Sequence, residues 1–200
     1  MNDNLAYKEE PRYEIIGGDV VMMAPASTNH NRVCYNISLL FGAYLKGRRC
    51  EYFPDGEGLF LDDGQEEYQP DGMVVCDPEK IQNRGIAGAP DFVLEVLSPG
   101  TAWYDRGRKK EAYARHGVRE YWIVNPKDCS VEQYALEEGQ YVLRNVYTYL
   151  TGEELSDLGE AERNRVRTEF QSVLFPDLTV RLEDVFYGVA RRRQDGEPRL

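Results

Sequence analysis

The chain has 200 residues, of which 42% are apolar and 30% are charged, a composition that excludes an intrinsically disordered chain. Its net charge of −11 excludes a protein that binds polyanions through a generally basic surface. No apolar run approaches the roughly 18 residues of a membrane span, and the polar start carries no secretory pattern, so we expect a cytoplasmic protein.

The first elements are expected to be a hairpin and a long helix. Residues 12–24 contain two short β-like runs separated by Gly17-Gly18. Ser27 and Thr28 offer an N-cap for a helix over 29–46, which Gly47 ends. One face of this helix is apolar, so it is expected to pack on a sheet and to share its domain: Val33, Cys34, Ile37, Leu40, Phe41, Tyr44 and Leu45.

The middle of the chain is expected to alternate strands and a helix. Strand-like runs occupy 49–53, 58–61, 71–76, 91–97 and 120–125, with a Gly- and Pro-rich connection over 79–90. Residues 91–97 are apolar on both faces, which is typical of a strand buried on each side. A helix is predicted from Thr101 to about Gly117, and the unit 91–125 predicts two parallel strands joined by that helix.

The predicted fold class is therefore α/β, in the sense of a mixed α+β protein, with a helix–three strands–helix–strand core. We expect one domain over 1–190, with its core at 12–150, an added N-terminal hairpin and a flexible tail at 191–200. A β-rich extension covers 130–149, followed by a loop or helix around 152–167, a short strand near 169–174 and a helix from about Glu183.

The four cysteines show no Cys-x-x-Cys pair and no nearby histidine at metal-ligand spacing. We therefore predict that all four are small buried hydrophobic residues: Cys34, Cys50, Cys76 and Cys129.

The chemically informative residue of the predicted sheet is Glu95, which stands inside an otherwise apolar strand. A buried carboxylate is usually paired, metal-bound or catalytic; the alternative is a strand-end glutamate that caps a helix or pairs with an arginine. Asp71 begins another apolar strand, and if the two strands are neighbours the carboxylates can converge on a hard cation such as Mg²⁺. Asp91, which begins the same strand as Glu95, is the nearest competitor.

A lysine on the following helix is the candidate for stabilising phosphate charge. Asp105, Lys109 and Tyr113 are spaced i, i+4, i+8 and so share one helix face. Lys110 points about 60° or more away from that face. From spacing alone, an exposed ion pair beside an aromatic anchor explains these residues better than a catalytic role.

Three segments, PDGMVVC, GAPDFVLEVLSPGT and DRGRKKEAYARHGVREYWIVNP, together resemble the bacterial restriction endonuclease-like (Uma-type) family of the PD-(D/E)XK nuclease superfamily. The opening YEIIGGDVVMMAPAS is also similar to the start of that family, and the resemblance covers approximately residues 12–150. It implies a DNA endonuclease that uses Mg²⁺ or Mn²⁺.

The resemblance also implies site residues. Pro70-Asp71 takes the place of the Pro-Asp motif, Glu95 that of the second acid, and the carbonyl of Val96 that of a further metal ligand. The superfamily lysine normally lies two residues after that acid, where this chain has Leu97. Lys109, with Lys110 as its neighbour, aligns instead. Two more positions match the family pattern: Glu14, as an extra metal-site acid, and His30, as a hydrogen-bond partner of a carboxylate or of the scissile phosphate.

Three functional hypotheses remain at this point. The first is a metal-dependent DNA endonuclease, expected to be a homodimer because such enzymes cut two strands. The second is an inactive binding or regulatory module on a nuclease scaffold. The third is a glycosidase with two acids and aromatic platforms drawn from Trp103, Tyr104, Tyr121 and Trp122.

Overall fold

The computed structural model describes residues 12–190; the tail predicted at 191–200 lies outside the described residues. The helices are α1 (Thr28–Leu45), α2 (Ala102–Arg106), α3 (Arg108–His116), α4 (Gly152–Asp157), α5 (Glu160–Arg163) and α6 (Leu182–Val185), with 3₁₀ turns η1 (Asp62–Gly64) and η2 (Pro78–Lys80). The strands are β1 (Tyr13–Ile16), β2 (Asp19–Met22), β3 (Glu51–Pro54), β4 (Leu59–Leu61), β5 (Glu66–Tyr68), β6 (Gly72–Val75), β7 (Ile81–Gln82), β8 (Gly85–Ala87), β9 (Phe92–Val96), β10 (Glu120–Asn125), β11 (Ser130–Glu137), β12 (Gln140–Thr148), β13 (Glu169–Gln171) and β14 (Thr179–Arg181). None of the helices in this range is long and apolar enough to cross a membrane.

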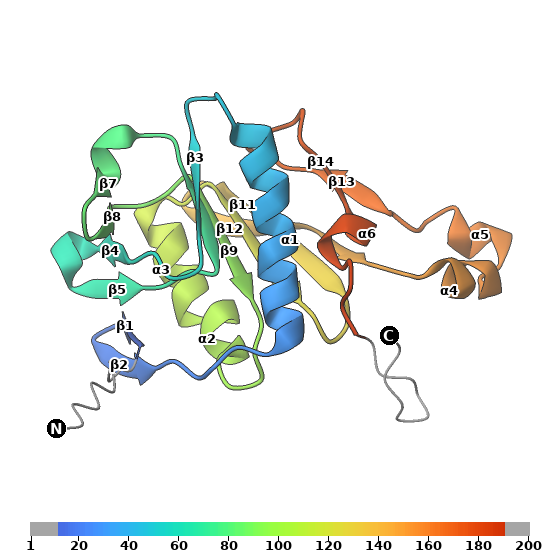
Figure 1. The fold of residues 1–200 in the computed structure, drawn as a ribbon, viewed down its shortest axis with the longest axis horizontal. Coiled ribbons are helices and arrows are strands. Elements are labelled where there is room, and N and C mark those ends of the chain that lie inside the picture. The colour runs from blue at the N-terminus through green and yellow to red at the C-terminus, as the bar shows by residue number, and fades with distance from the viewer. Residues whose placement is uncertain (1–11, 191–200) are drawn as a thin grey trace, which may run out of the picture.

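A six-stranded mixed sheet forms the centre of the fold, in the order β12-β11-β10-β9-β6-β3. Strands β9 and β10 are parallel and are joined through α2 and α3, as the sequence predicts, whereas β6 runs antiparallel to β9. Helix α1 crosses one face of this sheet, and α2 and α3 cover the other (Figure 1). The predicted mixed α+β class is confirmed.

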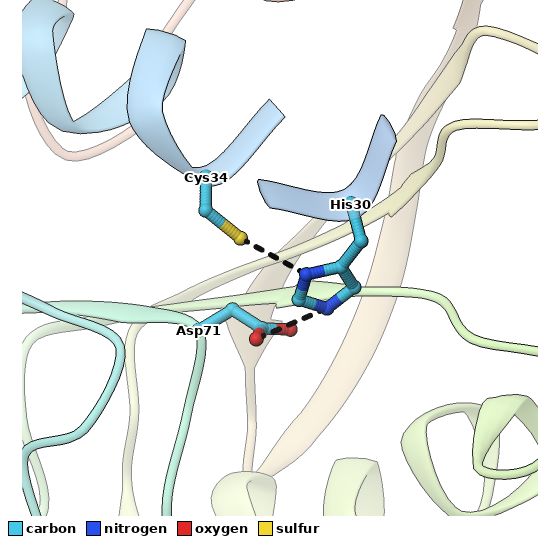
Figure 2. Close-up of side chains that lie close together, drawn as sticks. All are labelled: His30, Cys34 and Asp71. Carbon is cyan, nitrogen blue, oxygen red and sulfur yellow. Dashed lines mark hydrogen bonds and ion pairs between the residues drawn. The ribbon is translucent and has the colours of Figure 1, made fainter. Parts of the chain in front are cut away.

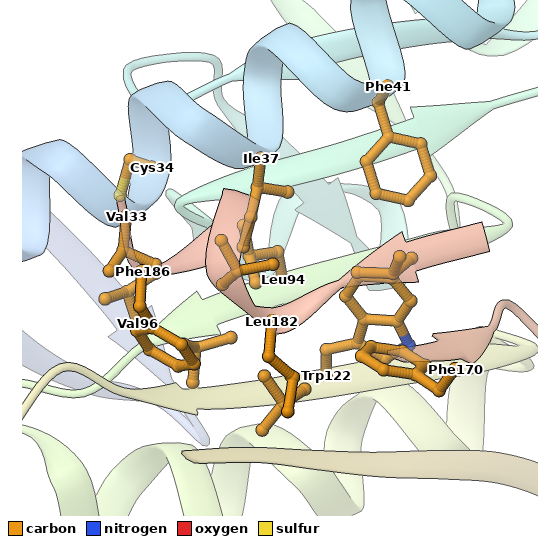
Figure 3. Close-up of a cluster of buried hydrophobic side chains, with 14 of the residues drawn as sticks. Val33, Cys34, Ile37, Phe41, Leu94, Val96, Trp122, Phe170, Leu182 and Phe186 are labelled. Atoms are coloured by element: carbon orange, nitrogen blue, oxygen red, sulfur yellow. The ribbon is translucent and has the colours of Figure 1, made fainter. Parts of the chain in front are cut away.

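The core beneath α1 consists of aliphatic and aromatic side chains (Figure 3). Phe92 packs edge-on against Trp122, with 4.9 Å between ring centroids, and Phe41 of α1 closes the group at 4.8 Å from Phe92. The buried face of α1 starts at the site residue His30 and includes most of the predicted apolar stripe, while Leu40 and Tyr44 lie at its half-buried margin. Ser27 caps the helix by accepting a hydrogen bond from the backbone N–H of His30.

A second six-stranded sheet, in the order β2-β1-β5-β4-β8-β7, was only partly predicted. The expected hairpin around Gly17-Gly18 is present as β1 and β2. Residues 79–90 are not a plain connection, because they contain η2, β7 and β8. These strands have two or three residues each, too few for a period-two pattern to stand out.

The helix predicted from Thr101 to Gly117 is broken at Gly107, which separates α2 from α3. Gly107 has φ −114° and ψ −105°, and a Cβ atom there would lie 2.9 Å from the carbonyl oxygen of Trp103. A residue without a side chain therefore allows the sharp change of direction. Lys109 becomes the second residue of α3 rather than a residue in the middle of one helix.

The prediction that all four cysteines are small buried hydrophobic residues is wrong for two of them. Cys50 and Cys76 form a disulfide, whereas Cys34 and Cys129 are free and buried. Cys50 precedes β3 and Cys76 follows β6, and the register pairs Glu51 with Val75. The antiparallel pairing thus places the two cysteines side by side, with 4.0 Å between Cα atoms.

Candidate active site

The two acids of the predicted metal site lie on neighbouring strands. Strands β6 and β9 pair with Gly72 opposite Leu94, so continuing the register by one residue places Asp71 opposite Glu95. Both carboxylates are buried, with Asp71 8% and Glu95 3% exposed. The condition on which their convergence depended is therefore met.

Glu95 is held by two donors that use the same oxygen. Lys109 Nζ lies 3.0 Å and the Tyr113 hydroxyl 2.8 Å from Oε1. Within residues 12–190, Oε2 accepts no hydrogen bond. Burial raises the pKa of Glu95 well above its usual value, and the charges of Asp105, Asp71 and Glu14 add to this effect against the opposing charge of Lys109.

A second buried carboxylate, Glu120, shows how a structural acid is satisfied in the same sheet. Its two oxygens accept five hydrogen bonds, from Trp122 Nε1, Gln133 Nε2, Ser172 Oγ and the backbone N–H groups of Val173 and Leu174. Buried polar groups in folded proteins are normally paired in this way. By comparison Glu95 keeps an unused oxygen, which favours a ligand-binding role over a purely structural one.

Lys109 lies at the centre of a group of carboxylates. Its Nζ is 2.9 Å from Glu14 Oε1, 3.0 Å from Glu95 Oε1 and 3.3 Å from Asp105 Oδ1, and the side chain is 4% exposed. Burial opposes the charge of this ammonium, but the surrounding carboxylates outweigh burial and hold the pKa of Lys109 well above its usual value. The ammonium is therefore fixed as a cation inside the site.

Lys110 points away from this group. Its Nζ lies 3.8 Å from the centre of the Tyr134 ring, on the side of α3 that faces β11. Burial lowers the pKa of Lys110. The geometry thus brings Lys109, and not its neighbour, to the carboxylates.

Asp71 is held between the sheet and the start of α1. Its Oδ2 accepts a 2.7 Å hydrogen bond from the Val96 backbone N–H, and its Oδ1 lies 3.2 Å from His30 Nε2. The other ring nitrogen of His30 is 3.5 Å from Cys34 Sγ, so His30 links the two side chains (Figure 2). Although burial opposes protonation, the hydrogen bond that the Asp71 carboxylate accepts raises the pKa of His30.

These side chains open into a cavity of about 390 Å³. Its wall includes the segment from Val21 to Ala26, which continues from β2, together with Arg12 and Asp55 near the rim. Arg12 is held there by Asp55 at 2.6 Å. The cavity is lined by all five predicted catalytic side chains: Glu14, His30, Asp71, Glu95 and Lys109.

The charge balance of the cavity suits a cation. Four buried carboxylates, from Glu14, Asp71, Glu95 and Asp105, line the cavity with a single lysine, which contacts three of them. Carboxylates therefore outnumber cationic side chains in the wall. Carboxylate oxygens are the ligands that Mg²⁺ prefers in proteins. The donor set therefore fits a hard divalent ion. His30, Cys34 and Asp71 also approach one another closely enough to hold a metal.

Two other sets of residues were candidates from the sequence: Asp91 as a metal ligand, and the aromatic residues of the glycosidase hypothesis. Asp91 accepts hydrogen bonds from the Cys76 backbone N–H at 2.7 Å and from Arg119 at 2.5 Å, at the opposite end of β9 from Glu95. Tyr121 and Trp122 are fully buried. They cannot form the aromatic platforms of a sugar-binding groove. Trp103 is exposed, but neither it nor Tyr104 lines the cavity that holds the acids, so the glycosidase hypothesis loses its main support.

Sequence reasoning noted three site residues without giving them a role. Asp105 and Tyr113 share the face of Lys109, and both contact the same group of charges. Cys34 was predicted to be a core residue, but its thiol reaches His30. The i, i+4, i+8 spacing was the available signal for the first two, while the contact of Cys34 depends on how α1 docks on the sheet.

Comparison with known proteins agrees with this fold. A family model described as "Uma2: Putative restriction endonuclease" matches residues 2–168. Two uncharacterised proteins of Synechocystis sp. (strain ATCC 27184 / PCC 6803 / Kazusa), slr1290 and sll1609, are each 29% identical, over 140 and 124 residues. The matches cover 69% and 60% of this chain and 74% and 70% of the relatives.

A solved structure extends the likeness to three dimensions. The crystal structure of "a putative nuclease belonging to DUF820" from Anabaena variabilis ATCC 29413 has a TM-score of 0.65, covers 89% of this chain and 91% of its own, and is 19% identical. The fold is thus that of a nuclease-like protein. The chain itself belongs to the Uma2 family, the restriction endonuclease-like group that its motifs resemble.

Proposed function

We propose that this protein is a metal-dependent endonuclease that hydrolyses phosphodiester bonds of DNA. The observation that carries the proposal is the convergence of Asp71, Glu95 and Lys109 in one cavity, with an unused oxygen on Glu95. Family membership supports a nucleic-acid substrate. The acidic net charge means that affinity for DNA must come from local contacts or from assembly rather than from the whole surface.

In this proposal Asp71, Glu95 and the carbonyl oxygen of Val96 hold one Mg²⁺ or Mn²⁺. The bound ion supplies Lewis-acid polarisation of a phosphate oxygen and lowers the pKa of an attacking water. The Val96 N–H and His30 fix the orientation of Asp71, and the Tyr113 hydroxyl fixes that of Glu95. Such contacts usually keep ligands in their productive geometry.

Lys109 has the role of stabilising negative charge on the phosphoryl group undergoing attack. Its ammonium is permanently charged at neutral pH and is held inside the cavity by Glu14 and Asp105 as well as by Glu95. A donor placed before the reaction costs no reorganisation when the charge develops. Removing one such donor typically lowers the rate by about 10²–10³-fold.

The test is cleavage of plasmid DNA by the full-length protein with Mg²⁺ or Mn²⁺, with and without chelator. Asp71→Asn and Glu95→Gln should abolish both divalent-ion binding, measured by calorimetry, and cleavage. Glu111→Gln is the matched control, because Glu111 is an exposed acid of α3 outside the cavity. Absence of specific divalent binding to the unmodified protein would refute the proposal and favour the inactive module.

We also propose a homodimer that pairs through β12. This strand forms one edge of the central sheet, and three of its apolar side chains are 40–47% exposed: Val142, Leu143 and Val146. An exposed edge strand with apolar side chains is a ready surface for pairing with another strand. Light scattering that gives a monomer mass at micromolar concentration would refute it.

A further inference from the structure

A second group of metal-ligating side chains lies outside the cavity, at the C-terminal end of α3. It consists of His116, the last residue of α3, Asp62 in η1 and Glu66, the first residue of β5. His116 Nε2 is 3.4 Å from Asp62 Oδ2 and 3.4 Å from Glu66 Oε2. None of the three lines the active-site cavity, so this group is independent of the function proposed above.

The spacing of these atoms is that of ligands around an ion. For metal bonds of about 2.1 Å in a tetrahedral arrangement, neighbouring ligand atoms lie roughly 3.4 Å apart. His116 Nε2 is itself buried, yet within residues 12–190 it makes a hydrogen bond with neither carboxylate. Its position 3.4 Å from an oxygen of each carboxylate therefore allows one ligand to be shared by the three groups.

Tyr68 gives a second, independent sign of an unfilled polar site. Its side chain is fully buried, and its hydroxyl makes no hydrogen bond within the described part of the chain. Tyr68 stands two residues after Glu66 on β5, so both side chains point to the same side of the strand.

The charges around the group allow a dication. Arg115 Nη2 donates to both oxygens of Glu66 at 2.9 Å, so Asp62, Glu66 and Arg115 together carry a net charge of −1. Contacts of this kind from outside the ligand set usually orient a metal-binding carboxylate. One imidazole nitrogen with two carboxylate oxygens is a donor set that suits Zn²⁺.

We propose that Asp62, Glu66 and His116 form a structural binding site for a first-row transition-metal dication, with Zn²⁺ as the representative ion. The site joins the end of α3 to η1 and to the start of β5. Lys109 stands at the other end of α3, and β5 leads within three residues to Asp71. The ion therefore stabilises the elements that position the active site without taking part in its chemistry.

The chain contains two histidines, His30 and His116, so their imidazole NMR signals distinguish the two candidate locations. Zn²⁺ is titrated into the metal-free full-length protein, with binding also measured by calorimetry and by the thermal midpoint. The expected result is a shift of the His116 signals, saturating at one equivalent, and a rise in the midpoint.

Two variants and a control make the assignment specific. Asp62→Asn should weaken Zn²⁺ binding at least tenfold. The variant should retain the fold, because asparagine tolerates the positive φ of 46° at this position and the side chain is half exposed. His116→Gln should abolish the effect. Asp63→Asn, which removes the same charge from the neighbouring exposed residue, should bind Zn²⁺ as the unmodified protein does.

Two results would overturn the proposal. One is Zn²⁺ affinity that is unchanged in Asp62→Asn and His116→Gln. The other is a Zn²⁺-dependent shift confined to the His30 signals, which would place the ion at His30, Cys34 and Asp71 instead (Figure 2).

Discussion

Replacing Lys109 by methionine should destabilise the metal-free protein far more than the same replacement of Lys110. Lys109 is ion-paired with three buried carboxylates, so Lys109→Met leaves their charge uncompensated. Breaking a buried ion pair in this way typically costs about 3–5 kcal/mol. At about 2–4 °C per kcal/mol for a chain of this size, the midpoint should fall by roughly 6–20 °C.

The matched variant, Lys110→Met, loses a cation–π contact with Tyr134. Such a contact contributes about 0.5–1 kcal/mol at an exposed site, so the midpoint should change by no more than about 4 °C. The comparison keeps side-chain length and charge change constant between neighbouring residues. Only the surroundings of the two ammonium groups differ.

The stability deficit of Lys109→Met, meaning the fall in its thermal midpoint relative to the unmodified protein, should depend on pH. A raised pKa in the folded state means that the Lys109 contribution is fully present below the lysine pKa of the unfolded chain and is lost at higher pH. Glu95 and Asp105 also have raised pKa values, mainly through burial, and their protonation on acidification removes the charge that Lys109 compensates. The deficit should therefore shrink towards acidic pH.

Calorimetric or circular-dichroism melts of the three proteins between about pH 5 and 9, with chelator present, measure this directly. A deficit that does not change with pH, or an equal loss in Lys110→Met, would refute the electrostatic reasoning.

Three further outcomes are expected. Glu95→Gln should raise the thermal midpoint of the metal-free protein while abolishing cleavage. The variant removes a carboxylate whose charged form is unfavourable, as its raised pKa indicates, and it keeps an oxygen that can accept from Tyr113. A lowered thermal midpoint in the presence of chelator would contradict this. Cys50→Ser should lower the free energy of unfolding by about 3.5 kcal/mol, because the disulfide closes a loop with a sequence separation of 26. The unmodified protein in reductant should melt at the same temperature as this variant. Val146→Lys should leave a monomer in light scattering if β12 forms the dimer interface, whereas an unchanged dimer mass would rule out this edge.

The central sheet was predictable because its strands carry long, distinctive patterns. EYWIVN matches β10 over 120–125, and the apolar run at 91–97 contains β9. Two- and three-residue strands such as β7 and β8 give no periodic signal, and their pairing depends on contacts between distant segments. The disulfide was missed for the same reason, since its cysteines become neighbours only when β3 pairs with β6.

The acids of the candidate site were easier to find than its supporting residues. Asp71 begins one apolar strand and Glu95 stands inside another, which makes each of them conspicuous in the sequence. Cys34 and Asp62 give no comparable signal. The first is indistinguishable from a core residue of α1, and the second reaches His116 only because η1 turns back on the end of α3.

The position of the lysine follows from the packing around Glu95. A lysine two residues after Glu95 would stand on the same face of β9, where Leu97 is 8% exposed and packs into the hydrophobic cluster beneath α3. An ammonium there would have to be buried at the cost of that cluster. Lys109 approaches Glu95 from α3 instead, and its ammonium also contacts Asp105 of α2, across the break at Gly107. The chain thus keeps an apolar strand while supplying the charge from a helix.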